Sequence, residues 1–232
     1  MNNFDDKENC GEQSFETKVI VFDIGGVLVD LDMEQCVRRC KEEIGFDRIE
    51  EFLDPCHQKG FFRKFEAGEI SLEDFRKMVL SMCRPGVKAE DADKAFSGLV
   101  TGIAPYKIAL LKELSSKYEL YALSNNNAAA MPYCYKLFEQ QGLPMNSVFR
   151  KLYLSYELHM LKPHDDIFQY TIADIYKLYS ESHSMAAVIG PQNMLYIDDS
   201  ASNVEAATAN GFNAVLYVPG SDLKETIESA LR

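Results

Sequence analysis

Short hydrophobic runs alternate along most of the chain with longer stretches of helical periodicity. The runs are rich in β-branched and aromatic residues and lie at Lys18–Phe22, Glu119–Leu123, Leu152–Leu154, Met194–Ile197 and Ala214–Val218. Helical periods cover Tyr106–Lys117, Ala128–Gln141, Asp165–Leu178, Ser202–Asn210 and Ser221–Leu231. Strands that alternate with helices of this length indicate crossover connections between parallel strands. The pattern therefore predicts an α/β fold, with a Rossmann-like parallel sheet and helices on both faces.

One long segment interrupts this alternation. Between about Met33 and Val100 the pattern is helical and contains no strand candidate, with helices expected at Met33–Ile44, Ile49–Phe52, Phe61–Glu66, Ser71–Met82 and Glu90–Leu99. Ser71 precedes Glu73 and Asp74 as in a capping box, which marks a helix start. We predict that residues 33–100 form an α-helical cap inserted into a core of residues 18–32 and 101–232. Residues 1–17 carry five acids against one base and are expected to form a flexible arm.

Composition and charge narrow the classes of partner. The chain has 232 residues and a formal net charge of -12, which argues against nucleic acid and anionic membranes, because both attract basic surfaces. No apolar run approaches the roughly 18–20 residues that span a bilayer. The N-terminal residues lack the pattern of a secretory signal, and the six cysteines form no CxxC pair. We expect a reduced cytoplasmic protein, monomeric or homodimeric.

Polar residues with chemical potential follow several of the predicted strands. Asp23, Ser124 and the pair Asp198-Asp199 each come directly after a hydrophobic run, and the carboxyl ends of parallel strands meet at one edge of a sheet. Lys162 lies just before the helix expected at Asp165. Each residue alone also has a structural explanation, such as a turn, a helix cap or a solvated charge. The two adjacent carboxylates repel each other and call for a compensating cation.

The order of these residues resembles the haloacid dehalogenase (HAD) superfamily. Its four motifs are present here as Phe22-Asp-Ile-Gly-Gly-Val-Leu28, Leu123-Ser-Asn125, Leu161-Lys-Pro163 and Tyr196-Ile-Asp-Asp-Ser-Ala-Ser-Asn203. The helical insertion resembles the small, C1-type cap of that family. The stretch from Phe65 to Phe75 is similar to cap segments in the subgroup that contains sugar-phosphate phosphatases.

The resemblance implies a magnesium-dependent phosphatase of a small phosphorylated metabolite, with a sugar phosphate as one candidate. Asp23 would be the nucleophile that forms an aspartyl-phosphate. The implied Mg²⁺ ligands are Asp23, the Gly25 carbonyl and Asp199. Asp198 would be a further ligand or would lie next to one. Ser124, Lys162 and backbone amides around Asn125 and Gly25-Gly26 would hold the phosphoryl oxygens.

One position departs from the family pattern. Gly25 stands where most phosphatases of the family have a second Asp that protonates the leaving group and activates water. Three explanations of how the protein works without this Asp remain open. Either the leaving group needs little protonation, or a cap residue such as His57 or Glu66 supplies the proton, or the protein is a weak catalyst that mainly binds its ligand. One alternative to a phosphatase is a haloacid dehalogenase-type hydrolase, which also uses an aspartate nucleophile and needs no metal. The other, suggested by Gly25, is a HAD-like binding or regulatory protein.

Overall fold

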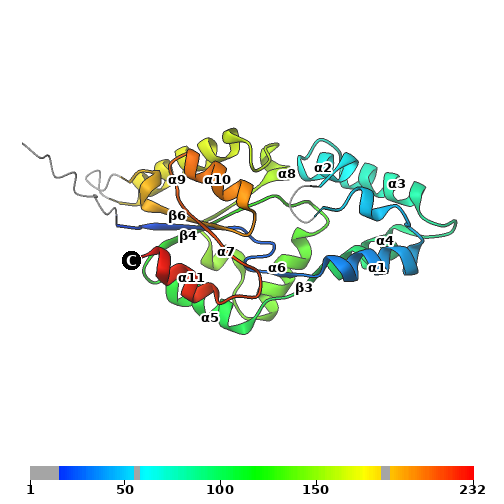
Figure 1. Ribbon diagram of the computed structural model, residues 1–232, viewed down its shortest axis with the longest axis horizontal. Helices are drawn as coiled ribbons and strands as arrows, with labels where there is room; N and C mark the ends of the chain where they lie inside the picture. The colour runs from blue at the N-terminus through cyan, green and yellow to red at the C-terminus, as the bar shows by residue number, and fades with distance from the viewer. Residues whose placement is uncertain (1–15, 55–57, 184–188) are drawn as a thin grey trace, which may run out of the picture.

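Five parallel strands form the central sheet of the protein (Figure 1). The computed structural model describes residues 16–54, 58–183 and 189–232, and in these residues the strand order is β5-β4-β1-β6-β7. The strands are β1 (Val19–Phe22), β4 (Glu119–Ser124), β5 (Lys151–Leu154), β6 (Met194–Asp198) and β7 (Asn213–Leu216). The prediction of a Rossmann-like parallel sheet is confirmed. The central strand β1 pairs with β4 on one side and with β6 on the other.

Helices cover both faces of this sheet, as the continuous hydrophobic runs require. One face carries α5 (Pro105–Leu114), α6 (Met131–Gln140) and α11 (Leu223–Ala230), and the other carries α9 (Asp165–Ser182) and α10 (Ala201–Ala209). Ile20 and Phe22 of β1 pack into the first layer, while Val19 and Val21 pack into the second. Because successive residues of β1 are buried on opposite faces of the sheet, no position of the strand is polar. This explains why its hydrophobic run is unbroken in the sequence.

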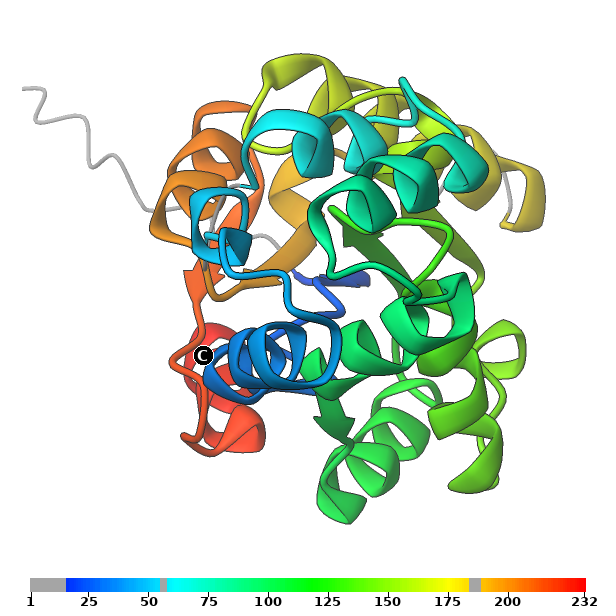
Figure 2. The ribbon, with the colours of Figure 1, turned by 90° about the vertical axis from the view of Figure 1, so that its right-hand side faces the viewer.

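The helices of the insertion lie at one end of the sheet and have a hydrophobic core of their own (Figures 1 and 2). They are α1 (Met33–Ile44), η1 (Ile49–Glu51), α2 (Gly60–Glu66), α3 (Leu72–Met82), α4 (Ala89–Phe96) and η2 (Ser97–Leu99). The Ser71 hydroxyl accepts a hydrogen bond of 3.1 Å from the Asp74 amide, so the expected helix start is confirmed. We call these helices the cap; its boundaries at residues 33 and 100 stay a prediction. The arm predicted at residues 1–17 lies, apart from its last two residues, outside the described residues.

A two-stranded ribbon that the sequence analysis did not predict joins the cap to the core. Strand β2 (Asp30–Leu31) pairs antiparallel with β3 (Val100–Gly102), which places the entry and the exit of the cap side by side. Strands of two or three residues are too short to show a period in the sequence. The short elements α7 (Met145–Val148), α8 (Ser155–Leu158) and η3 (Pro191–Asn193) were not expected either, for the same reason.

The start of α6 also differs from the expectation. The helix begins at Met131 rather than at Ala128, because the Asn127 side chain accepts hydrogen bonds from the amides of Ala129 and Ala130. This side chain holds the preceding residues in a turn, and the helix follows it. Within the described part of the chain, no helix is both long enough and apolar enough to cross a membrane.

Candidate active site

The structure brings together the residues that follow three neighbouring strands. Asp23 follows β1, Ser124 ends β4 and Asp198 ends β6, with Asp199 next to it. Carboxylate oxygens of the three aspartates lie within 4.8 Å of one another. Because β1 lies between β4 and β6, their carboxyl ends meet, as the sequence pattern indicated. Lys162 enters the same cluster from the loop before α9.

Lys162 is held at the centre of the cluster by three acceptors. Its ammonium donates to the Leu123 carbonyl at 3.0 Å and to Asp198 Oδ2 at 2.6 Å, and it lies 3.2 Å from Asp23 Oδ1. Burial opposes the charged form, but the two carboxylates raise the pKa of Lys162 above its usual value. The Asn125 side chain brackets the lysine backbone, with its amide donating to the Lys162 carbonyl and its oxygen accepting from the Lys162 amide. The charge is therefore fixed in position.

Asp198 uses both of its oxygens within the protein. Oδ1 accepts from the Ser200 amide at 2.8 Å and from Asn203 Nδ2 at 3.0 Å, and Oδ2 accepts from Lys162 and from the Tyr196 hydroxyl. Burial disfavours ionisation, yet Lys162 and these hydrogen bonds keep the pKa of Asp198 below its usual value. Asp198 is thus a buried anion that orients Lys162.

The two other aspartates lie in an excess of negative charge. Burial raises the pKa of Asp23 to about 7, with the charges of Asp198 and Asp199 adding to the effect and Lys162 opposing it. Burial, followed by the charge of Asp198, raises the pKa of Asp199 to about 6. Three carboxylates around one ammonium leave a net negative site of oxygen donors, and this donor set fits a hard divalent cation such as Mg²⁺.

The two glycines in the turn after Asp23 have different surroundings. Gly25 lines the cavity beside Asp23, whereas Gly26 has a φ of 75°, and a Cβ atom there would lie 2.0 Å from Asp199 Oδ2. The Gly26 amide, expected to contact a phosphoryl oxygen, instead donates to the Val29 carbonyl at 2.9 Å. The role of Gly26 is therefore steric, because its lack of a side chain lets Asp199 approach the turn.

Substitution of Gly26 by alanine is expected to displace the Asp199 carboxylate and weaken Mg²⁺ binding. Disturbing the surroundings of a metal ligand typically costs about 10–100-fold in metal affinity, and the positive φ adds strain. Isothermal titration of Mg²⁺ into the protein measures the change. Gly102→Ala is the matched control, since a Cβ at Gly102 meets no atom within 4 Å. Equal Mg²⁺ affinity of Gly26→Ala and wild type would contradict this account of the turn.

Three residues that support the site carried no role in the sequence analysis. Tyr196 and Asn203 hydrogen-bond to Asp198, and both stand within the fourth motif, where their polar groups were the available signal. Ser155 begins α8, donates to the Glu66 carbonyl of the cap at 2.7 Å and accepts from the Asn126 amide at 3.0 Å. No pattern in the sequence marks Ser155, because its importance arises from the meeting of cap and core.

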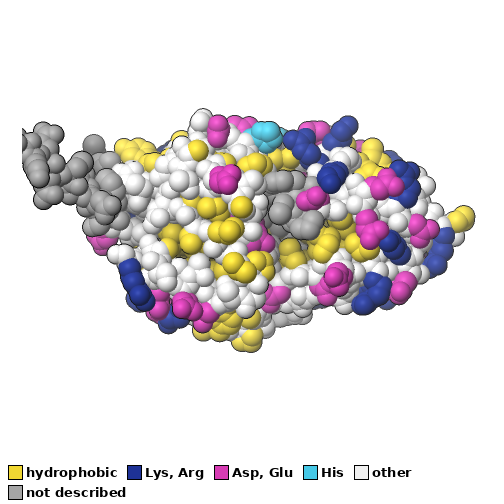
Figure 3. Space-filling view, in the orientation of Figure 1, with side chains coloured by type: hydrophobic (Ala, Val, Ile, Leu, Met, Phe, Trp, Pro, Cys, Tyr) yellow, Lys and Arg dark blue, Asp and Glu magenta, His cyan; other side chains and the backbone are white. Residues whose placement is uncertain are grey.

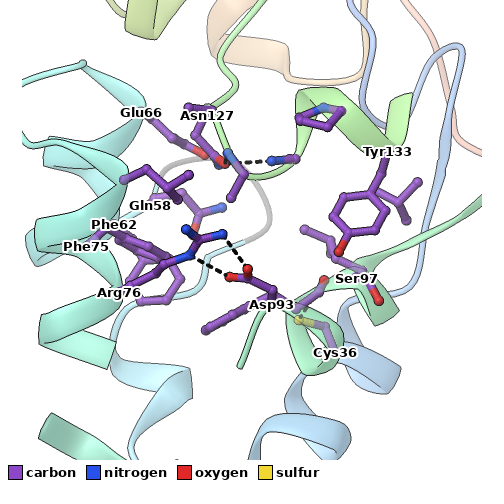
Figure 4. Close-up of a pocket in the computed structure, with 18 of the residues that line it drawn as sticks. Cys36, Gln58, Phe62, Glu66, Phe75, Arg76, Asp93, Ser97, Asn127 and Tyr133 are labelled. Carbon is purple, nitrogen blue, oxygen red and sulfur yellow. Dashed lines mark hydrogen bonds and ion pairs between the residues drawn. The ribbon is translucent and has the colours of Figure 1, made fainter. Parts of the chain in front are cut away.

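Two adjacent cavities, which share part of their lining, lie between the cap and the core. The smaller one, of about 130 Å³, surrounds Asp23, Asp199 and Lys162. The larger one, of about 280 Å³, has aromatic walls from Phe62, Phe75, Phe96 and Tyr133. Figure 4 shows the ion pair of Arg76 and Asp93, with an Nε–Oδ1 distance of 3.1 Å, projecting into this larger cavity. We call the two the carboxylate cavity and the cap cavity.

Comparison with known proteins places this architecture in a family. D-ribitol-5-phosphate phosphatase from Bacteroides thetaiotaomicron is 32% identical over 211 residues, which are 90% of this chain and 96% of that protein. A HAD family enzyme from the same organism, an aspartate-to-alanine variant crystallised with magnesium and inorganic phosphate, is 31% identical with a TM-score of 0.82, over 91% of this chain and 98% of that one. The chain belongs to the HAD family.

A second solved structure extends the agreement to another organism. A HAD-like family hydrolase from Porphyromonas gingivalis is 32% identical with a TM-score of 0.80, over 93% of this chain and 98% of its own. No protein-family model matches the chain. The HAD family assignment thus rests on similarity over nearly the whole length of its relatives, cap included, and the resemblance seen in the four motifs is confirmed.

Proposed function

We propose that this HAD protein is a magnesium-dependent phosphatase of a small sugar or polyol phosphate, acting through an aspartyl-phosphate at Asp23. The observation that carries the proposal is the cluster of Asp23, Asp199 and Lys162 at the floor of a cavity that opens under the cap. The similarity to D-ribitol-5-phosphate phosphatase, and to HAD enzymes crystallised with magnesium and inorganic phosphate, supports it. The enzyme class is phosphoric monoester hydrolase.

Each residue of the cluster then has a distinct task. Asp23 attacks the phosphorus, and its carboxylate is oriented by the Ile24 amide, which donates to Oδ1 at 2.7 Å, and by Lys162 on the same oxygen. The carboxylates of Asp23 and Asp199 and the carbonyl of Gly25 would hold Mg²⁺. When bound, Mg²⁺ neutralises charge between an anionic nucleophile and a phosphoryl dianion. Asp198 keeps Lys162 in place.

The phosphoryl oxygens meet the positive and polar groups around Asp23. Lys162 supplies a fixed positive charge, and the backbone around Asn125 lines the same cavity. The buried Ser124 hydroxyl hydrogen-bonds to Asp23 and lowers its pKa, against the larger effect of burial. Ser124 does not line the carboxylate cavity, so we assign it to the nucleophile rather than to the phosphoryl oxygens. This division between positioning and electrostatics is the usual one in phosphoryl transfer.

The cap cavity supports a hydroxylated leaving group of several carbons. Its volume of about 280 Å³ exceeds the space that a phosphoryl group needs, and its walls combine aromatic rings with the polar pair Arg76–Asp93. A sugar or polyol phosphate would place its dianion at the carboxylate cavity and its hydroxylated body here. On the face drawn in Figure 3, the Lys and Arg side chains of the cap lie among Asp and Glu side chains.

The alternatives to a phosphatase are not favoured. A haloacid dehalogenase would bind a carboxylate substrate, which the charge of Asp198 and Asp199 would repel in the absence of a metal. The relatives crystallised with magnesium and inorganic phosphate point away from metal-free chemistry. A protein that only binds its ligand would have no need of a buried, oriented Asp23.

A screen of phosphorylated metabolites tests the proposal. With Mg²⁺ the protein is expected to release inorganic phosphate from sugar or polyol phosphates. A chelator should abolish the release, and added Mg²⁺ should restore it, because the carboxylate cluster needs a cation before a dianion can approach. Phosphate release measured by a colorimetric assay is the readout. Absence of release from the whole panel, or halide release from a 2-haloacid that a chelator does not affect, would refute the proposal.

A further inference from the structure

The two cavities meet at a place that the reaction itself defines. In a phosphate monoester the phosphorus must lie next to Asp23 in the carboxylate cavity, and the leaving group must extend into the cap cavity. The oxygen of the bond that breaks therefore lies at the junction. Among the residues that the structure describes, six line both cavities: Gln58, Glu66, Leu99, Val100, Asn127 and Ala130.

Glu66 is the titratable residue among these six. The other two polar side chains are engaged with backbone: Gln58 with both the amide and the carbonyl of Asp54, and Asn127 with the turn before α6. An alkoxide leaving group is strongly basic, so its departure needs a proton donor within reach of the ester oxygen. Of the described residues that line both cavities, only Glu66 has an ionisable side chain.

The groups of the carboxylate cavity do not meet this need. The three hydrogens of the Lys162 ammonium face the Leu123 carbonyl, Asp198 and Asp23. Asp23 is the nucleophile and Asp199 a proposed Mg²⁺ ligand, so both carboxylates are required as anions. Gly25, beside Asp23, has no side chain to contribute.

The backbone of Glu66 is well fixed, while its carboxyl group has no fixed partner among the residues that the structure describes. Glu66 is the last residue of α2, its carbonyl accepts from Ser155 Oγ at 2.7 Å, and the ring of the preceding Phe65 stacks on Phe75 with centroids 4.2 Å apart. Within the described residues, no hydrogen bond or ion pair involves the Glu66 carboxyl group. Figure 4 shows Glu66 beside Asn127 at the edge of the cap cavity. This arrangement leaves the carboxyl group free to bond to a substrate.

We propose that Glu66 is a catalytic residue of this phosphatase, serving as the general acid for the leaving group and then as the general base for water. This inference rests on the phosphatase function proposed above. It assigns to the cap the proton transfer for which the turn at Gly25 has no side chain. The cap would thereby contribute to chemistry as well as to substrate fit.

The proton balance of the two half-reactions is closed. As an oxygen of Asp23 bonds to phosphorus, the P–O bond to the leaving group breaks, its electron pair goes to the leaving oxygen, and the Glu66 carboxyl group transfers its proton there. In the second half-reaction Glu66 takes a proton from a water molecule whose oxygen bonds to phosphorus. The P–O bond to Asp23 then breaks, which restores the Asp23 carboxylate, releases inorganic phosphate and leaves Glu66 protonated.

The electrostatic surroundings of Glu66 support this role. Burial, followed by the negative charge of Asp23, raises the pKa of Glu66 to about 8, and Lys162 opposes the shift. A carboxyl group with a raised pKa holds a proton at neutral pH, as a general acid must before the substrate reacts.

A comparison of substrates with different leaving groups tests the proposal directly. Glu66→Gln keeps the shape of the side chain and removes the transferable proton. Its kcat/KM, which reports the steps up to departure of the alcohol, is expected to fall about 10²–10⁴-fold on a pentitol phosphate, whose leaving group is a basic alkoxide. The leaving group of p-nitrophenyl phosphate is stable without protonation. On this substrate the rate of phosphoenzyme formation, measured from the rapid burst of p-nitrophenol, should change less than about threefold. Glu69→Gln, at an exposed acid three residues along the cap, is the matched control.

Wild-type protein provides a second test that does not depend on the variant folding. Over a series of alkyl and aryl phosphates, kcat/KM should depend only weakly on the pKa of the leaving alcohol, because Glu66 protonates it as it departs. A steep dependence in wild type would overturn the acid role. An equal loss of rate in Glu66→Gln on the pentitol phosphate and on p-nitrophenyl phosphate would overturn it too. If wild type released no phosphate from any ester, the phosphatase proposal itself would fail, and that result is distinct from either of these.

Discussion

Replacement of Asp23 by asparagine is expected to reduce phosphate release about 10⁴-fold or more, the scale of loss when a covalent catalyst loses its nucleophile. The amide of asparagine cannot form the acyl-phosphate and is a poor ligand for Mg²⁺. The loss should not come from unfolding, because asparagine has the same shape as aspartate and its oxygen can still accept from the Ile24 amide. The substitution also removes one of three crowded carboxylates.

Steady-state phosphate release and trapping of the phosphoenzyme measure this effect together. Wild-type protein quenched in acid during turnover should carry one phosphoryl group by mass spectrometry, and Asp23→Asn should carry none. Asp47→Asn, at an exposed aspartate of the cap, serves as the control and should behave as wild type. Retention of more than about one hundredth of the wild-type rate by Asp23→Asn would exclude Asp23 as the nucleophile.

Replacement of Lys162 by methionine is expected to lower the free energy of unfolding by about 3–5 kcal/mol, the usual cost of removing one partner of a buried ion pair. Lys162 is 2% exposed and lies 2.6 Å from Asp198 and 3.2 Å from Asp23. Without the ammonium, two carboxylates remain in a buried site with no compensating charge. Activity should be lost as well, since the phosphoryl group loses its fixed positive contact.

Lys107 provides a matched control for this measurement. Its side chain is also buried, and its ammonium lies 2.7 Å from Asp30 Oδ1, but the side chain of Asp30 is 48% exposed and stays hydrated when the lysine is removed. Lys107→Met should therefore lose about 1 kcal/mol from the ion pair itself. Urea unfolding of both variants in the presence of a chelator gives the comparison. Equal losses for the two lysines would show that the burial of the carboxylates at Lys162 does not decide the cost.

The sheet and the main site residues could be predicted because both depend on local signals. Strands that are buried on both faces, such as β1, β4 and β6, leave unbroken hydrophobic runs. Runs of this kind also located the less buried edge strands β5 and β7 to within a few residues. The rule that polar residues converge at the carboxyl ends of parallel strands then brought Asp23, Ser124 and the Asp198-Asp199 pair to one edge.

Other parts of the site depend on tertiary contacts that leave no periodic trace. Ser155 matters because the Glu66 carbonyl lies opposite it, 89 residues away in sequence. The two glycines of the turn look equivalent in the sequence, and only the packing of Asp199 on Gly26 separates their roles. Glu66 could be named as a candidate acid, but the side of α2 from which its carboxyl group reaches the cavities could not be read from helical periodicity. His57, the other candidate, lies outside the described residues.

The β2–β3 ribbon has a consequence for how the protein can be altered. Asp30 pairs with Gly102 and Leu31 with Val100, so the chain leaves the core and returns to it at nearly the same point. An insertion whose two ends already meet imposes no stretch on its host, and the entropy of closing it grows only with the logarithm of its length. The cap, which lies between the paired residues, can therefore be exchanged as a unit. Grafting caps of other shapes at this ribbon, with an acid kept at the position of Glu66, would redirect substrate choice while the aspartates of the core stay in place.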